Sequence, residues 1–217
     1  MTPFPRFSFL VALAAIVAGC ATVQPTETIG PNDPAALAAI RAAYVKAGEQ
    51  RSFRARMTSE SSGKVHENTI EFAAPSSMRM TMKTENMEHI IIGDAHYMKS
   101  DGKWIRVPGI TGSMIEQFRK DPQAIAAFER TVSGAQVVGP EAVGSQRAMA
   151  YRYYQAGRIA GGLASSAGWV KMWVGMNGLP IKVESDATGR VLGMSSQSRT
   201  TILYEDYGAP VRIVAPI

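Results

Sequence analysis

The sequence predicts an α+β domain in which a large curved antiparallel sheet forms a half-open β-barrel, with an N-terminal helix and short lid helices. Roughly nine to eleven short segments alternate apolar and polar residues and are separated by turn residues, which is typical of strands. One helical pattern precedes them and two short ones interrupt them. Strands adjacent in sequence usually pair, and a sheet this wide has to curl.

The chain starts with the layout of a secretory signal. Residues 7–18 are apolar apart from Ser8, Arg6 lies upstream, and small residues lead to Cys20, the only cysteine. The apolar run is shorter than the about 20 residues that span a membrane. Residues 17–20 resemble the bacterial lipobox. That resemblance implies that Cys20 becomes the first mature residue and carries acyl chains such as palmitate, which anchor the protein to membrane lipid outside the cytoplasm.

We therefore expect three parts: a signal peptide (1–19), the lipidated cysteine with a flexible tether (20–33), and a single domain (34–217). The 23 Lys and Arg residues exceed the 18 Asp and Glu residues only slightly and are spread along the chain, which argues against nucleic acid as a partner. With Cys20 acylated, no disulfide can form within the chain, so stability has to come from packing.

The first element of the domain is a helix over residues 34–47. Asp33 is placed as its N-cap, Pro34 occupies the first helical position and Gly48 ends it. Apolar residues recur at helical spacing at Leu37, Ile40, Ala43, Tyr44 and Ala47.

Six strands joined by tight turns are predicted next, at residues 53–57, 64–72, 77–83, 87–92, 95–99 and 103–107. The third is the clearest, because Met78, Met80 and Met82 alternate with polar residues. Two short helices follow, one opened by a capping box at Ser113 and one by Asp121 before Pro122. Their lid residues are Met114, Ile115, Phe118, Ile125 and Phe128.

The second half of the chain is predicted to return as strands at residues 135–138, 147–155, 169–175, 179–186 and 190–204. Asn177 and Gly178 form a strong hairpin signal. Residues 157–168, rich in Gly, Ala and Ser, are predicted to be a long flexible loop or at most a weak helix. The tail, residues 209–217, is predicted to pair at a sheet edge.

Several of these segments, in order, resemble a known family. Four parts of the chain are similar to motifs of the LolA/LolB-like and LppX/LprG-like lipoprotein and lipid carriers. They are residues 88–97 with 101–104, residues 138–144 with Tyr151, residues 170–174 with 178–184, and residues 204–208 with Pro210 and Pro216. The resemblance implies a half-barrel that holds acyl chains between a curved sheet and lid helices. With Ala21 and not aspartate after the lipidated cysteine, it also implies sorting to the periplasmic face of the outer membrane.

The candidate ligand cavity consists of apolar residues that alternate along the strands. They are Phe53, Met57, Ile70, Phe72, Met78, Met80, Met82, Val170, Met172 and Val174. Three interpretations of the methionines remain open: ordinary core, an adaptable acyl-chain cavity, and Cu(I) ligation by thioethers with a nearby histidine. His66, His89 and His96 share no helical ligand spacing, so no metal site is predicted.

No catalytic residues are predicted, because the Gly-x-Ser-x-Gly elbow, His-Glu-x-x-His and a phosphate-binding loop are all absent from the sequence. We expect no enzyme and no cofactor. The expected function is that of a membrane-anchored lipoprotein that binds lipid or acyl chains for carriage, insertion or sensing, with other lipoproteins as further partners. The alternatives are an envelope structural or protein-interaction lipoprotein and a methionine-rich Cu(I)-binding protein.

Overall fold

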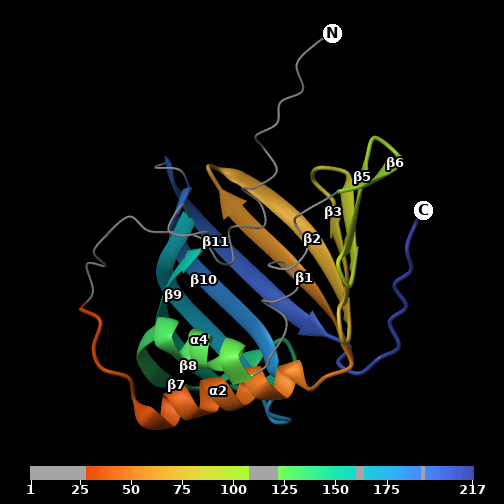
Figure 1. Cartoon of the computed structure of the whole chain (residues 1–217). Helices are drawn as coiled ribbons and strands as arrows, with labels where there is room; N and C mark the ends of the chain where they lie inside the picture. Colours follow the sequence, from red (N-terminus) through yellow and green to blue (C-terminus); the bar gives the residue numbers. More distant parts are fainter. Residues whose placement is uncertain (1–27, 108–121, 160–163, 192–193) are drawn as a thin grey trace.

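A computed structural model describes residues 28–107, 122–159, 164–191 and 194–217 (Figure 1). Eleven strands in the described part form one antiparallel sheet in the order β6-β5-β4-β3-β2-β1-β11-β10-β9-β8-β7. Their bounds are β1 Ser52–Ser61, β2 Lys64–Ala73, β3 Ser77–Met82, β4 Met87–Ile92, β5 Ala95–Ser100, β6 Lys103–Arg106, β7 Val132–Val143, β8 Gln146–Ile159, β9 Ala164–Gly175, β10 Pro180–Val191 and β11 Met194–Glu205. The sheet is strongly curved and stays open, which confirms the predicted half-open barrel.

Two meanders make up this sheet. Strands β1 to β6 pair in sequence order away from the centre, and β7 to β11 pair back towards it. The meanders join where β1 pairs with β11, from Arg54 opposite Glu205 to Ser61 opposite Ser198. Strands β6 and β7, at the two ends of the order, are never brought together.

Helix α2, Pro34–Gly48, confirms the first predicted helix. The Asp33 carboxylate accepts hydrogen bonds from the backbone N–H groups of Ala35, at 2.8 Å, and Ala36, as an N-cap does. Ala36, Ile40 and Ala43 are buried. Because two of these three are alanines, the helix backbone can approach the sheet closely.

Helix α4, Pro122–Thr131, confirms the second short helix of the middle region. Its Phe128 ring stacks on Tyr44 of α2 with 4.1 Å between centroids and meets Tyr153 of β8 edge-on at 6.1 Å. Both helices therefore lie inside the curve of the sheet, against the β7–β10 half (Figure 1). The other predicted helix, with Met114, Ile115 and Phe118, lies outside the described residues. No described helix has the length and apolar character needed to cross a membrane.

The face of the sheet that α2 and α4 cover is called the inner face below. Residues paired directly across antiparallel strands point to the same side. One row of residues paired in this way runs from β3 to β9 and consists of Met82, Asn68, Met57, Ile202, Val183 and Met172. Because Met172 packs with α2, the three methionines of β3 also lie on the inner face.

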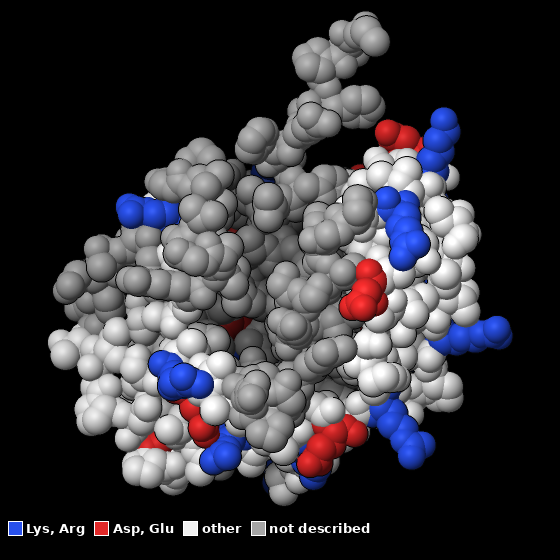
Figure 2. Space-filling model, viewed as in Figure 1, with Lys and Arg blue, Asp and Glu red and all other residues white. Residues whose placement is uncertain are grey.

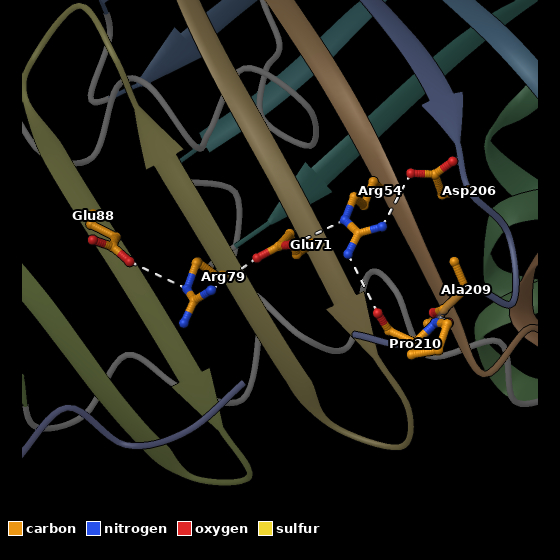
Figure 3. Close-up of polar contacts among 8 residues, drawn as sticks. Arg54, Glu71, Arg79, Glu88, Asp206, Ala209 and Pro210 are labelled. Atoms are coloured by element: carbon orange, nitrogen blue, oxygen red, sulfur yellow. Dashed lines mark hydrogen bonds and ion pairs between the residues drawn. The ribbon is translucent and has the colours of Figure 1, made fainter. Parts of the chain in front are cut away.

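The outer face carries charged side chains in ordered rows. Figure 3 shows one row that crosses four strands: Glu88 pairs with Arg79, Arg79 with Glu71, and Glu71 with Arg54. Arg54 also donates to Asp206, at 3.1 Å, and to the carbonyl of Pro210. The row thus fastens the segment after β11 to the outer side of β1.

Three sequence predictions are wrong. Residues 157–159 and 164–168 belong to β8 and β9 and are not in a loop or helix. The strand predicted at residues 190–204 starts too early: β10 continues through Gly189, which pairs with Ser166 and Ser196, to Val191, and β11 begins only at Met194. The tail forms no strand; instead Gly208 donates to the Ser52 carbonyl and the Ser52 hydroxyl donates to the Ala209 carbonyl.

Gly168 shows why residues 157–168 were wrongly predicted to be a loop. A Cβ atom built on Gly168 would lie 2.2 Å from the Asp186 carbonyl oxygen and 2.5 Å from the Ala187 Cα of the paired strand. Glycine is present here because β9 and β10 approach closely, and a side chain would push the backbones apart.

We expect Gly168→Ala to lower the free energy of unfolding by about 2–3 kcal/mol, because the added methyl overlaps backbone that cannot move away cheaply. Gly157→Ala on the neighbouring strand is the matched control, since a Cβ there meets nothing within 4 Å. That variant should stay within about 0.5 kcal/mol of the native chain. Urea denaturation followed by circular dichroism measures both, and equal effects would contradict the close approach.

Candidate functional site

The inner face contains two apolar clusters. The helix-side cluster combines α2, α4 and strands β7 to β9; its buried members are Ala36, Ile40, Ala43, Val132, Ala135, Tyr153, Val170 and Met172. The methionine cluster comes from strands β1 to β4; its buried members are Phe53, Ala55, Met57, Ile70, Phe72, Met78, Met80, Met82 and Ile91. Among the described residues, no helix side chain belongs to the methionine cluster. Within the described part of the chain, its buried members all come from one face of the sheet.

The predicted cavity residues are divided between these two clusters. Seven of them, from Phe53 to Met82, belong to the methionine cluster. Val170 and Met172 are buried in the helix-side cluster, and Val174 packs against it half-buried. Phe128 packs against the same cluster, and Ile125 of α4 is half-buried. The helices thus cover Val170 and Met172, whereas the methionines of β3 lie further along the sheet.

A continuous apolar row connects the two clusters. Met57 of β1 pairs with Ile202 of β11, Ile202 with Val183 of β10, and Val183 with Met172 of β9. Met172 in turn pairs with Tyr151 of β8. An extended apolar molecule could follow this row from one cluster to the other without crossing a charged side chain.

Aromatic rings close one side of the methionine cluster. Phe53 and Phe72 stack at 5.2 Å, and Tyr204 meets Phe53 edge-on at 5.7 Å. Tyr207 donates its hydroxyl to the carbonyl of Pro180 at 2.8 Å. Burial raises the pKa of both tyrosine hydroxyls well above the ordinary value, so these rings are neutral at physiological pH.

The inner face becomes polar towards one end of the strands. Beyond Met57 the next inward residue of β1 is Ser59, which pairs with Thr200, and Thr200 pairs with Ser185. Further on, Gly189 pairs with Ser166 and with Ser196. One end of the curved face is therefore lined by methionine and aromatic rings, and the other by small hydroxyl side chains.

Two buried polar residues on this face were missed by the sequence reasoning. Asn68 and Thr200 are each 3% exposed, and the Asn68 Oδ1 and Thr200 Oγ1 atoms have no hydrogen-bond partner among the described residues. Leaving such atoms unsatisfied costs about 1–3 kcal/mol each. The available signal was a polar residue at an inward position of an otherwise apolar alternation. They could supply hydrogen bonds to a polar group of a bound molecule.

Two histidines also lie on the inner face, beside the methionine cluster. His89 of β4 and His96 of β5 are 5% and 3% exposed, and 2.9 Å separates Nδ1 of His89 from Nε2 of His96. Burial, together with the charge that His96 would carry, lowers the pKa of His89 to about 4. Burial also lowers the pKa of His96. Both rings are therefore neutral at pH 7.

Figure 2 shows how charged side chains are distributed over the described part of one face. In the described part of that view, basic and acidic side chains are scattered around the margin, and no large patch of one sign forms. Among the described residues, no group of three His, Cys, Asp or Glu side chains could hold a metal ion.

We expect the protein to lose stability in acid because of His89. The unfolded chain binds a proton with a pKa near 6.5, whereas the folded chain resists protonation down to about pH 4. The free energy of unfolding therefore keeps its full value above pH 6.5, and on the order of 3 kcal/mol of it is lost as the pH falls towards 4. Between pH 7 and pH 4, the urea concentration at the midpoint of unfolding should fall less steeply for His89→Leu than for the native chain. Equal slopes for the two proteins would contradict this role of His89.

Comparisons with known proteins support the architecture. No family model matches the sequence, and no curated protein matches it. Among solved structures, lipoprotein LppX from Mycobacterium tuberculosis superposes with a TM-score of 0.58 at 16% identity, covering 84% of this chain and 100% of LppX. LprF from Mycobacterium bovis gives a TM-score of 0.57 at 13% identity, covering 86% and 99%. The chain thus has the half-barrel fold of LppX and LprF, as its sequence motifs imply.

Proposed function

We propose that the protein is a lipid-anchored envelope lipoprotein that holds acyl chains against the inner face of its half-barrel. The observation that carries this proposal is the methionine cluster, an apolar face of four strands to which no described helix contributes a side chain. The fold shared with LppX, itself named a lipoprotein, agrees with it.

The methionine cluster suits a flexible apolar guest. Methionine side chains are unbranched and polarizable, so they can repack around chains of different length and unsaturation. Each methylene moved from water to this surface contributes about 0.8 kcal/mol. A single long acyl chain could therefore bind without a charged partner, and selectivity among acyl chains should be low.

The polarity of the face also suggests an orientation for the guest. Its acyl chain would follow the apolar row through Met57, Ile202 and Val183, and its polar group would lie towards Ser59 and Thr200. The Oδ1 of Asn68 and the Oγ1 of Thr200 are then available to hydroxyl or amide donors. An amphiphile satisfies this surface better than a plain hydrocarbon.

Anchoring follows from the start of the sequence. The apolar residues 7–18 and the small residues before Cys20 support removal of residues 1–19 and acylation of Cys20. The tether, residues 20–33, would then place the single domain, residues 34–217, near the membrane. Ala21 supports a place on the periplasmic face of the outer membrane. The role is one of binding for carriage, insertion or sensing, with other lipoproteins as partners, and not of catalysis.

We expect Ala55→Phe to reduce acyl-chain binding at least tenfold. Ala55 is 2% exposed at the centre of the methionine cluster, between the cross-strand partners Ile70 and Tyr204, so a phenyl ring there would occupy the surface used by the guest. Native mass spectrometry of co-purified lipid and displacement of a fluorescent fatty acid measure the loss.

Thr58→Phe is the matched control, because Thr58 lies on the exposed outer side of the same strand. This variant should bind like the native protein. Circular dichroism verifies that Ala55→Phe still folds, since overpacking costs about 1–3 kcal/mol. Native protein that carries no lipid and fails to bind the probe would refute the proposal.

The anchor is tested separately. We expect native protein made in a Gram-negative host to sediment with outer membranes and to yield an N-terminal peptide whose mass includes diacylglycerol and a further acyl chain on Cys20. Cys20→Ser should abolish the added mass and the cleavage after residue 19. An unmodified Cys20 in the membrane fraction would contradict lipidation while leaving acyl-chain binding by the domain open.

A further inference from the structure

The segment after β11, residues 206–210, is fastened to the outer face of the sheet at both of its ends. Arg54 of β1 donates to the Asp206 carboxylate at 3.1 Å and to the Pro210 carbonyl at 3.4 Å (Figure 3). The Glu71 carboxylate on the neighbouring strand holds the same guanidinium, with 3.1 Å between Nε and Oε1. Residues 206–210 are called the strap below.

The middle of the strap reaches the inner face. The N–H of Gly208 donates to the Ser52 carbonyl at 2.9 Å, and the Ser52 hydroxyl donates to the carbonyl of Ala209. Ser52 is buried at the start of β1. Tyr207 packs against the methionine cluster, and its hydroxyl donates to the carbonyl of Pro180 at the start of β10, at 2.8 Å. Tyr207 is therefore held both at its backbone and at its hydroxyl.

Tyr207 completes a group of four aromatic rings at this end of the methionine cluster. Its ring stacks on that of Tyr204, with 6.0 Å between centroids and 14° between planes, and lies 6.0 Å from the ring of Phe53. Phe53 in turn stacks on Phe72 at 5.2 Å. These four residues are called the aromatic wall below. The wall extends from β2 to the start of β10, where the Tyr207 hydroxyl is bonded to Pro180.

The distance from the polar end of the inner face to the aromatic wall suits one acyl chain. Ser59 and Phe53 are six residues apart on β1, and a strand rises about 3.3 Å per residue, which gives about 20 Å. One leaflet of a bilayer has a hydrocarbon layer about 15 Å deep. A guest whose polar group lies at Ser59 would therefore bring the end of its acyl chain to the wall.

We propose that Tyr207 limits the length of the acyl chain that the inner face accepts, and that Arg54 positions Tyr207 through the strap. The inference rests on the proposed function and adds a selectivity to it. The methionines can repack around different guests, whereas the Tyr207 ring is held by stacking, by its hydroxyl and by a backbone fastened on the outer face. Chains below the limit are accepted broadly, and longer chains meet a ring that is fixed in place.

Binding measured against chain length tests this limit. Saturated fatty acids of about 12 to about 22 carbons bracket a chain about 20 Å long, and they would displace a fluorescent fatty acid from the delipidated native protein. Each methylene that reaches the apolar face should tighten binding up to about fourfold, and methylenes beyond the wall should add nothing.

Tyr207→Ala should raise the chain length at which this gain stops by about four carbons, since an aromatic ring covers about as much area as that many methylenes. Tyr207→Phe keeps the ring and should keep the native limit. Tyr97→Ala is the matched control, because Tyr97 is a half-buried tyrosine of β5 in the same outer-face row as Ile90 and Arg79. It should leave the limit unchanged.

Arg54→Gln tests the strap without changing an apolar residue. Because Tyr207 is then fastened less firmly, the limit should rise in the same direction as in Tyr207→Ala, by fewer carbons. Arg56→Gln is its matched control, since Arg56 lies on the same face of β1 and pairs with Glu205, outside the strap. Circular dichroism verifies the fold of each variant.

The outcomes separate this inference from the proposed function. A native protein whose gain continues to the longest chain, or an unchanged limit in Tyr207→Ala, would overturn the inference and leave acyl-chain binding intact. An unchanged limit in Arg54→Gln alone would remove the role of Arg54. Should Tyr207→Ala not fold, the limit in Arg54→Gln decides. Native protein that binds none of the fatty acids would overturn both the proposed function and this inference.

Discussion

The pairing of β1 with β11 is the constraint on which the rest of the structure depends. These strands lie near opposite ends of the sequence, yet they are paired over eight residues, from Arg54 opposite Glu205 to Ser61 opposite Ser198. Within each meander every pair joins strands that are consecutive in sequence. Only this junction makes one sheet of them, and a shift of one residue would turn Met57 away from Ile202 and break the apolar row.

The sequence predicted an element correctly where one of its faces is buried and the other is exposed to solvent. The alternation of Met78, Met80 and Met82 was enough to predict β3 and its inward side, and the cap at Asp33 predicted the start of α2. The prediction from sequence was wrong at residues 157–168, because the glycine and serine residues there are locally typical of a loop. Gly168 is instead required by the close approach of β10, a tertiary contact that no local pattern contains.

The candidate site was predictable in part for the same reason. Inward alternation placed Met57 and Ile70 on one face, but it could not show that the helices cover Val170 and not Met80. The histidine pair was missed because ligand spacing was sought along helices. The hairpin at Gly93 and Asp94 sets the register that places Ile91 opposite His96 and His89 opposite Met98, so a register count would have found it. Whether the predicted cavity residues bind a guest stays a prediction.

The open form of the barrel leaves β6 and β7 with backbone groups that a foreign strand could capture, which is the route to aggregation for many sheets. Each margin carries its own protection. Strand β6 is only four residues long and includes Lys103 and Arg106. Strand β7 has register irregularities between Ser133 and Gln136 and between Val137 and Gly139, followed by Pro140. Such interruptions disfavour the pairing of a second copy of the chain with either edge of the sheet.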